Sequence, residues 1–342
     1  MKVILDARKI SHGGIGLYVY NLIKLYEINN YDYFLIINKN KNKLEQERLN
    51  SLKLKDYLEL DLKAFSVIEQ ANLSFEINKL SKFDIFHSPY IPLVSEINSK
   101  IKKVLTIHDL IYLSKFYPFY KRIIFKYLIN KSIKNADLIQ TVSNSSLNLI
   151  SKITNKKIDL VPNTLFLSDT VSYKDRNKIL IILSNTKKHK RVKDIVRFLN
   201  TNKLNQEVVV IGQIDKLKIN NLNKITYKLR VSDTELYQNF QKAKCLIIPS
   251  LIEGFCIQAL ISRYYAVPII CRPDAAISSF CLKEDSIAKS FSYKDFKDLI
   301  LKNINTPTDF EAFRKKSINI FNQYKPETIA KTLDASYKQV LK

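Results

Sequence analysis

LIIPSLIEGFCIQALISRYYAVPII, residues 246–270, is the stretch that decides the fold. It predicts a buried strand at residues 246–248, a polar loop, a helix from about Phe255, and a second apolar strand at Val267. Strand, loop, helix and strand in this order form the crossover unit of a parallel sheet. Ligands of such sheets bind beyond the carboxyl ends of the strands. We therefore expect Glu253 and Gly254, which follow the first strand, at a ligand site.

The role of Glu253 has two interpretations. The N–H groups of the helical turn after Gly254 favour an anion such as phosphate. A carboxylate beside a phosphate is repelled by it, so Glu253 would need a further contact, such as sugar hydroxyls. Alternatively, Glu253 only caps the helix, because acidic residues are common near helix starts.

Length and composition indicate two globular domains. The chain has 342 residues, 46% of them hydrophobic. No apolar run is long enough to span a membrane, and Asp6 and Arg8 come too early for a signal peptide, so we expect a cytoplasmic protein. The four cysteines lie within residues 245–281 without CxxC spacing, which is typical of reduced core residues rather than a zinc site or a disulfide framework.

The net charge of +24 favours polyanionic partners: nucleic acid, anionic lipid or phosphorylated small molecules. Alternatively, many lysines are only solvated surface. No nucleic-acid-binding motif accompanies the charge, so we expect no nucleic-acid partner.

A glycine cluster follows the first predicted strand. The chain has only five glycines, and Gly13, Gly14 and Gly16 form the sequence HGGIG before an apolar-periodic helix. A glycine-rich turn between strand and helix is typical of phosphate binding. The dinucleotide pattern GxGxxG is not formed, because its third glycine is missing.

Histidines end two consecutive predicted strands. His87 follows the apolar run FDIF, and His108 and Asp109 follow KVLTI. The carboxyl ends of parallel strands share one crevice, which favours a functional role for these side chains over a role in core packing. For a single histidine the structural role would be the simpler interpretation.

Two basic segments each leave alternatives open. Residues 115–134, KFYPFYKRIIFKYLINKSIK, contain six basic residues, no acidic residue and many aromatic ones. This segment predicts either a helix that lies on an anionic bilayer or an ordinary domain helix whose lysines reach into solvent. The run NTKKHKRVK, with Lys190 and Arg191, follows another strand and is either a diphosphate site or a solvated face.

Strands and helices alternate in two successive sets of about 160 residues each, which predicts two doubly wound α/β domains facing each other across a cleft. We expect the first domain at residues 1–165 and the second at 166–325, with the linker within residues 164–177.

Seven motifs together resemble a known family. In chain order they are DARKISHGGIGLYVYNL, FDIFHSPY, TIHDL, ADLIQTVSNSS, VPN, VSDTELYQNFQKAKCLIIPSLIEGF and AVPII. They resemble family 4 of the retaining, nucleotide-sugar-dependent glycosyltransferases of GT-B architecture. The likeness runs from Asp6 to the last helix and is greatest to bacterial mannosyl- and rhamnosyltransferases that build O-antigen, capsule or other surface glycans.

The resemblance implies a GT-B fold of two Rossmann-like domains. The acceptor, a glycan or a lipid-linked sugar, would bind to residues 1–165 and the nucleotide sugar to residues 166–325, while a C-terminal helix, 326–342, would cross back to the first domain. Transfer would be retaining, with attack on the same face and without a metal or another cofactor. The protein would act in the cytoplasm, peripherally on the inner face of the plasma membrane if the basic segment binds lipid.

The resemblance also implies roles for individual residues. His108 would lie beside the reacting sugar, Lys190 would neutralise the leaving diphosphate, and Glu253 would hold donor hydroxyls. The further donor-binding residues implied are Gly13, Gly14, Gly16, Arg191, Gly254, Phe255, Cys256 and Gln258, and the acceptor-side residues are His87 and Asp109.

The chain departs from the family pattern at several positions. Ile261 replaces a second glutamate that would bind ribose, and Gln258 is the neighbour that would substitute for it. Cys256 replaces a glycine, Leu17 replaces an arginine, and Ser184 or Asn185 replaces a basic residue. The alternative function is therefore a non-catalytic homologue that binds a glycan or a partner transferase.

Overall fold

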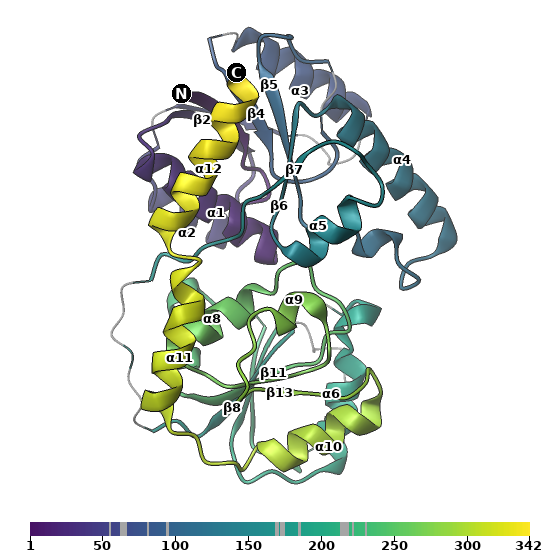
Figure 1. Ribbon diagram of the computed structural model, residues 1–342, viewed down its shortest axis with the longest axis vertical. Coiled ribbons are helices and arrows are strands. Elements are labelled where there is room, and N and C mark those ends of the chain that lie inside the picture. The colour runs from purple at the N-terminus through teal and green to yellow at the C-terminus, as the bar shows by residue number, and fades with distance from the viewer. Residues whose placement is uncertain are drawn as a thin grey trace. The chain divides into compact units, whose positions relative to one another are not determined.

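The computed structural model describes residues 1–54, 56–61, 67–80, 82–93, 96–167, 171, 175–183, 186–212, 219–220, 222–229 and 231–342, with the backbone alone for 67–71. The chain divides into two compact units (Figure 1). Unit 1 consists of Met1–Phe166 and Tyr324–Lys342, and unit 2 is Leu167–Gln323. The predicted linker, 164–177, lies partly outside the described residues, as do Ser184 and Asn185.

Unit 1 is a parallel seven-stranded sheet with the strand order β3-β2-β1-β4-β5-β6-β7. The strands are β1 (Lys2–Asp6), β2 (Asp32–Asn38), β3 (Asp56–Leu60), β4 (Ile85–Ser88), β5 (Lys102–Ile107), β6 (Leu138–Thr141) and β7 (Ile158–Leu160). The helices are α1 (Gly13–Ile28), α2 (Lys43–Asn50), α3 (Val67–Lys79), α4 (Phe119–Asn135), α5 (Asn144–Ile150) and α12 (Pro326–Leu341), with a short 3-10 turn η1 (Ile111–Leu113).

The central strands of unit 1 are apolar because both faces of the sheet are covered by helices. Ile4, Phe86 and Leu105 are fully buried in one core cluster, which also takes in Ile129 from α4 and Ile150 from α5. The order of the strands reverses between β1 and β4. In doubly wound sheets this is the point where ligands bind, beyond the carboxyl ends of the two strands.

The last helix, α12, completes unit 1. It packs on α1, and Tyr31 donates a 2.8 Å hydrogen bond to Asp334. Gln140 at the end of β6 donates to Ser336 at 2.9 Å. Pro326 lies in the first turn of α12, where its missing N–H group costs no helical hydrogen bond. The chain therefore returns to its first unit after completing the second.

Unit 2 is a parallel six-stranded sheet with the order β10-β9-β8-β11-β12-β13. Its strands are β8 (Lys178–Leu183), β9 (Val208–Gly212), β10 (Ile225–Lys228), β11 (Ala243–Ile248), β12 (Ile269–Cys271) and β13 (Ser286–Ile287). The helices are α6 (Val192–Thr201), α7 (Asp233–Gln241), α8 (Ile257–Tyr265), α9 (Ala275–Ser278), α10 (Tyr293–Asn303) and α11 (Phe310–Asn322), with a 3-10 turn η2 (Lys188–Lys190).

The stretch 246–270 forms the predicted crossover unit, β11, α8 and β12, and the predicted doubly wound α/β class is confirmed in both units. The helix begins at Ile257 instead of Phe255, because Cys256 precedes it in the left-handed region with φ 67°. The strand order of unit 2 reverses between β8 and β11. The loops that follow these two strands therefore meet at the ligand-binding edge of the sheet.

Candidate functional site

The candidate site of unit 2 lies where the loops after β8 and β11 meet. The N–H group of Leu251 donates a 2.8 Å hydrogen bond to the backbone carbonyl of His189, which joins the two loops. His189 is buried, and this burial, reinforced by the positive charge of Lys190, lowers its pKa to about 4. His189 is therefore neutral at physiological pH and serves as a support for this junction.

Lys190 and Glu253 form an ion pair across this junction. The Lys190 ammonium lies 2.6 Å from Oε1 and 2.7 Å from Oε2 of Glu253. Each side chain is only 13% exposed, so solvent screens this attraction weakly. The sequence placed these two residues after different strands, and the structure brings them together. The pair presents a cation for phosphate and a carboxylate for hydroxyls at the same edge of the sheet.

A second charged network supports the first loop. Arg191, whose φ is 51°, caps α6, and its guanidinium donates two 2.9 Å hydrogen bonds to the Asp194 carboxylate. Arg272, which is fully buried at the end of β12, donates to the same carboxylate at 2.5 Å and also to the carbonyl of Pro249. Arg272 thus links the first turn of α6, which follows the loop after β8, to the loop after β11. Neither Arg272 nor Asp194 was predicted from the sequence as a site residue, although Arg272 follows an apolar strand as Glu253 does.

Asp274 holds the backbone at Glu253. Its carboxylate accepts hydrogen bonds from the N–H groups of Ala276 and Ile277 at 3.1 Å and from that of Glu253 at 3.3 Å. Burial raises the pKa of Asp274 to about 6, and the nearby Glu253 charge adds to that effect. Asp274 was not predicted from the sequence as a site residue either.

The turn before α8 places a helix N-terminus at this edge of the sheet. Cys256 makes no side-chain capping hydrogen bond, and the first turn of α8 holds no acidic residue. The predicted donor contacts from Gly254, Phe255 and Cys256 fall in this turn, and the Phe255 ring packs edge-on against Phe280 at 5.1 Å. Such a helix start attracts an anion through its N–H groups and its dipole.

On α8 itself, the two residues considered for ribose binding differ in exposure. Gln258 lies in the first turn and is partly exposed. Ile261 is 1% exposed and belongs to the buried face of the helix. Of these two side chains, only that of Gln258 reaches the surface of the helix.

In unit 1 the glycine cluster divides into two parts at the start of α1. Gly13 has φ +54°, and a Cβ atom added at Gly13 or Gly14 would meet nothing within 4 Å. At Gly16, by contrast, an added Cβ would lie 2.5 Å from the carbonyl oxygen of Ile10. The N–H group of Gly16 donates a hydrogen bond to the backbone carbonyl of His12. Gly13 and Gly14 are thus open to a ligand. Gly16 is required for packing, so the predicted donor contact from Gly16 is not supported.

His108 lies just beyond β5 in a neutral form. Burial lowers its pKa to about 4, and its ring contacts Tyr18 edge-on at 4.8 Å. Nε2 lies 2.9 Å from the carbonyl oxygen of Pro89, which can only accept, so Nε2 carries the proton and Nδ1 the lone pair. In this tautomer His108 is an uncharged hydrogen-bond acceptor at Nδ1.

The acceptor-side predictions differ in outcome. The Asp109 carboxylate accepts a 2.9 Å hydrogen bond from the N–H group of Ile111 and shapes the turn after His108. The prediction for His87 is wrong, because its ring is fully buried. Its Nδ1 lies 2.5 Å from the hydroxyl of Tyr337, and its Nε2 lies 2.7 Å from that of Thr106. His87 therefore links α12 to the sheet instead of touching a substrate.

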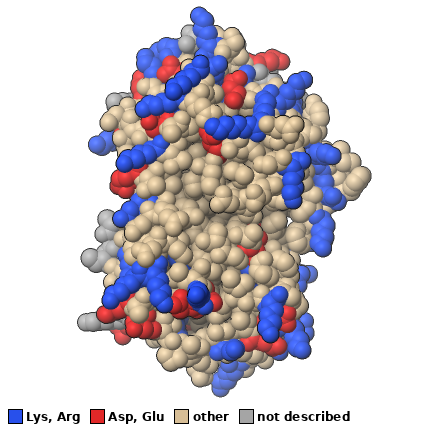
Figure 2. Space-filling view, viewed as in Figure 1, with Lys and Arg blue, Asp and Glu red and all other residues tan. Residues whose placement is uncertain are grey.

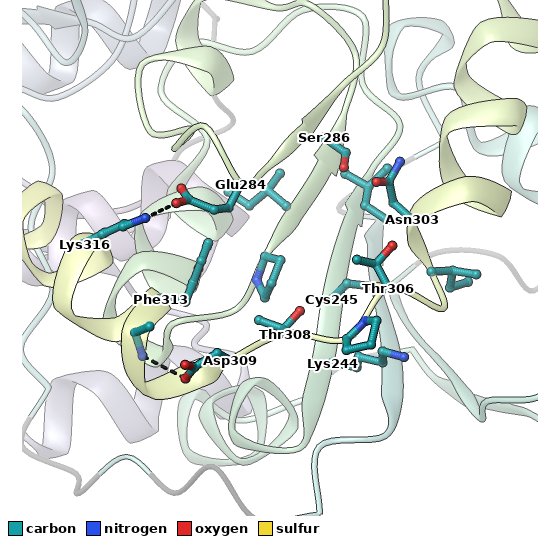
Figure 3. Close-up of a pocket in the computed structure, with 16 residues that line it drawn as sticks. Lys244, Cys245, Glu284, Ser286, Asn303, Thr306, Thr308, Asp309, Phe313 and Lys316 are labelled. Atoms are coloured by element: carbon teal, nitrogen blue, oxygen red, sulfur yellow. Dashed lines mark hydrogen bonds and ion pairs between the residues drawn. The ribbon is translucent and has the colours of Figure 1, made fainter.

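A cavity of about 430 Å³ lies elsewhere in unit 2 (Figure 3). It is lined by the amino ends of the strands, including Lys244 of β11, Ile269 of β12 and Ser286 of β13, and by the start of α11. It is therefore at the edge of the sheet opposite to Lys190 and Glu253. Its polar wall includes an ion pair between Lys316 and Glu284.

The described residues include neither a metal-binding cluster nor a helix that could cross a membrane. No group of three or more His, Cys, Asp or Glu side chains is arranged to hold a metal ion in this part of the chain. Among its helices, none combines the length and the apolar character that crossing a bilayer requires.

Comparison with known proteins agrees with the division of the chain into two units. Residues 12–167 match the model of glycosyltransferase family 4, and residues 168–319 match that of glycosyl transferases group 1. The chain belongs to the GT-B glycosyltransferases. The first segment lies within unit 1 apart from its last residue and the second within unit 2, and the resemblance seen in the sequence is confirmed as far as a glycosyltransferase of GT-B fold.

Solved structures share this GT-B fold at low sequence identity. HepE of Anabaena in complex with UDP-glucose has a TM-score of 0.75 and 13% identity, over 99% of this chain and 100% of that one. TarM of S. aureus, as a mutant in complex with fondaparinux, α-GlcNAc-glycerol and UDP, has a TM-score of 0.74 and 14% identity, over 98% and 99%.

A curated relative matches part of the chain. The O-antigen chain mannosyltransferase RfbU of Salmonella typhimurium is 25% identical over 185 residues. The match covers 49% of this GT-B chain and 51% of RfbU, so the chain spans about half the length of this relative.

Proposed function

We propose that this protein is a retaining glycosyltransferase that moves a hexose or deoxyhexose, mannose or rhamnose in particular, from a nucleotide sugar to a glycan or lipid-linked acceptor. The product would be part of an O-antigen or another surface polysaccharide, built in the cytoplasm. The observation that carries the proposal is the Lys190–Glu253 pair at the strand-order reversal of unit 2. The relative named as an O-antigen mannosyltransferase favours this sugar and product class.

The residues of unit 2 suit a nucleoside diphosphate sugar. The start of α8, which has no side-chain cap, and the Lys190 ammonium would stabilise the negative charge of the diphosphate as it leaves. Because these groups are already in position, the protein would not have to reorganise during the reaction. Glu253 would accept hydrogen bonds from sugar hydroxyls. Arg272 and Asp194 would act on the loops, holding the backbone on which Lys190 and Glu253 stand.

The residues of unit 1 fit a reaction in which no charged side chain acts as the base for the acceptor hydroxyl. His108 is neutral and offers a lone pair at Nδ1, so it would bind a sugar hydroxyl rather than carry a positive charge to it. Gly13 and Gly14 leave room for phosphate at the start of α1. We infer same-face attack, with the departing phosphate taking the acceptor proton and without participation of a metal ion.

A non-catalytic homologue is the second candidate. The observation that favours it is Ile261, which offers an apolar, buried side chain where the family has a carboxylate. Such a protein would bind a glycan or a partner transferase and release no nucleoside diphosphate.

One assay separates these candidates. Release of nucleoside diphosphate from GDP-, UDP- and dTDP-sugars is measured with and without a bacterial lipid extract as acceptor, and the anomeric configuration of the product is read by NMR. The Glu253→Ala variant should lose transfer. Its matched control is Glu235→Ala, which breaks a 2.6 Å ion pair to Lys228 in the same unit. Transfer that survives in Glu253→Ala would refute the assigned role, and an inverted product would refute the retaining mechanism.

A further inference from the structure

The helix α4 exposes an unusual number of large apolar side chains. We define the α4 face as Phe119, Tyr120, Ile123, Ile124 and Tyr127. Their exposed fractions are 71%, 60%, 54%, 55% and 64%, respectively. They follow the spacing i, i+1, i+4, i+5 and i+8, so they share one side of the helix. The α4 face is thus a continuous apolar surface in contact with solvent.

The α4 face is not needed for folding, because the other side of the helix supplies the packing. Ile129 and Ile133 are buried in the core of unit 1, and Phe125 and Leu128 pack against that core. Ser132 on the same side accepts a 3.0 Å hydrogen bond from the N–H group of Leu93. The helix is therefore apolar on two sides, and only one of them is covered within the unit. In Figure 1, α4 runs along the outer edge of unit 1.

Basic residues surround the α4 face. Lys121, Lys126, Lys131 and Lys134 are all exposed on the same helix, and residues 115–134 include no acidic side chain. The first helical turn has no acidic residue to match the helix dipole. Figure 2 shows Lys and Arg side chains beside uncharged surface at the right-hand edge, over α4. Apolar groups ringed by lysines match the two layers of an anionic bilayer, the acyl boundary and the phosphates.

We propose that the α4 face docks on an anionic lipid bilayer. Its aromatic and isoleucine side chains enter the boundary between headgroups and acyl chains, and the four lysines contact lipid phosphates. A second copy of the chain fits this surface less well, because a symmetric contact would bring two rings of lysines together. The inference goes beyond the proposed transfer reaction, and its test does not depend on that activity.

Vesicle binding tests this proposal directly. The full chain should sediment with vesicles of phosphatidylglycerol and phosphatidylcholine and much less with phosphatidylcholine alone. Binding to the anionic vesicles should fall by at least about tenfold in the double variant Ile123→Ser/Ile124→Ser and in Lys126→Glu/Lys131→Glu. The matched control is Phe75→Ser, which removes a side chain that is 62% exposed on α3 of the same unit.

The sequence contains no tryptophan, which allows a reporter on the surface itself. Tyr127→Trp should shift its emission to the blue on anionic vesicles, and Phe75→Trp should not. Nucleotide binding by all variants should remain at the level of the wild type, which separates this result from a failure of the proposed function. The inference is overturned if the wild type does not bind anionic vesicles, if both variants bind as the wild type does, or if Ile123→Ser/Ile124→Ser only converts a dimer into a monomer.

Discussion

Replacing Glu253 by glutamine should change donor binding and transfer in opposite directions. Glutamine keeps the size of the side chain and one oxygen for the Lys190 ammonium, which lies 2.6 Å from Glu253 Oε1. It removes one negative charge from the place where we propose that the diphosphate binds. The variant should therefore bind a nucleoside diphosphate more tightly than the wild type and transfer sugar more slowly.

The expected size follows from the geometry of the pair. A phosphate that contacts the same ammonium as Glu253 would lie about 5 Å from the carboxylate, where two unit charges repel by about 3 kcal/mol at an effective dielectric constant of about 20. The pair itself is only 13% exposed, but a bound phosphate would also be attracted by the Lys190 ammonium and would face solvent on its other side, so only part of this repulsion is felt. We expect a net gain of about 1–2 kcal/mol, or about tenfold tighter binding of the diphosphate. Transfer should fall at least about a hundredfold, because the variant loses charged hydrogen bonds to the sugar.

Calorimetric titration of GDP, UDP and dTDP, run beside a transfer assay, measures both quantities on the same preparation. Lys190→Met is the companion variant and should weaken diphosphate binding. Weaker diphosphate binding by Glu253→Gln would refute the reasoning, because it would mean that the carboxylate serves only to position Lys190.

Three further changes test other parts of the structure. Gly14→Ala should weaken donor binding but leave unit 1 as stable as before, because its Cβ meets nothing within 4 Å. Gly16→Ala should lower the free energy of unfolding of unit 1 by about 1–3 kcal/mol, because its Cβ clashes with backbone. Unfolding in urea, monitored by hydrogen exchange, measures both stabilities, and equal values would contradict the packing role of Gly16. Asp194→Asn should lower the free energy of unfolding of unit 2 by about 3–5 kcal/mol, since Arg272 stays buried without its carboxylate partner. A loss below about 1 kcal/mol would show that this ion pair does not stabilise the unit. Burial lowers the pKa of His87 to about 3, so only the unfolded chain takes up its proton between pH 7 and pH 5, and stability falls on acidification by about 2 kcal/mol. His87→Asn should lack this part of the loss, and identical pH profiles of variant and wild type would argue against it.

Much of the fold was predictable because apolar runs and chain order determine a doubly wound sheet. The run 246–270 specified β11, α8 and β12, and the positions of Lys190 and Glu253 after strands placed both at the same edge. That they form an ion pair was not predictable, because the register of neighbouring strands decides which loops meet. Arg272 was missed for the same reason, since a lone arginine after a strand does not reveal a buried carboxylate partner.

Two other residues show where a local pattern misleads. His87 lies near the end of β4 and His108 just beyond β5, but Tyr337 of α12, which comes 250 residues after His87 in the chain, covers His87. Gly16 belongs to a phosphate-binding sequence pattern, yet the close approach of Ile10 accounts for it. The role of His87 is decided by a contact with a helix far along the chain, and that of Gly16 by its distance to the backbone of Ile10. The residues of each motif alone reveal neither the contact nor the distance.

The central claim is that unit 2 binds a nucleotide sugar through Lys190 and Glu253. The most direct measurement is a thermal-shift panel of GDP, UDP and dTDP and their sugars, on the wild type and on Lys190→Met. One nucleotide should raise the melting temperature of the wild type clearly and that of Lys190→Met much less. Equal shifts in both proteins, or no shift with any nucleotide, would contradict the claim.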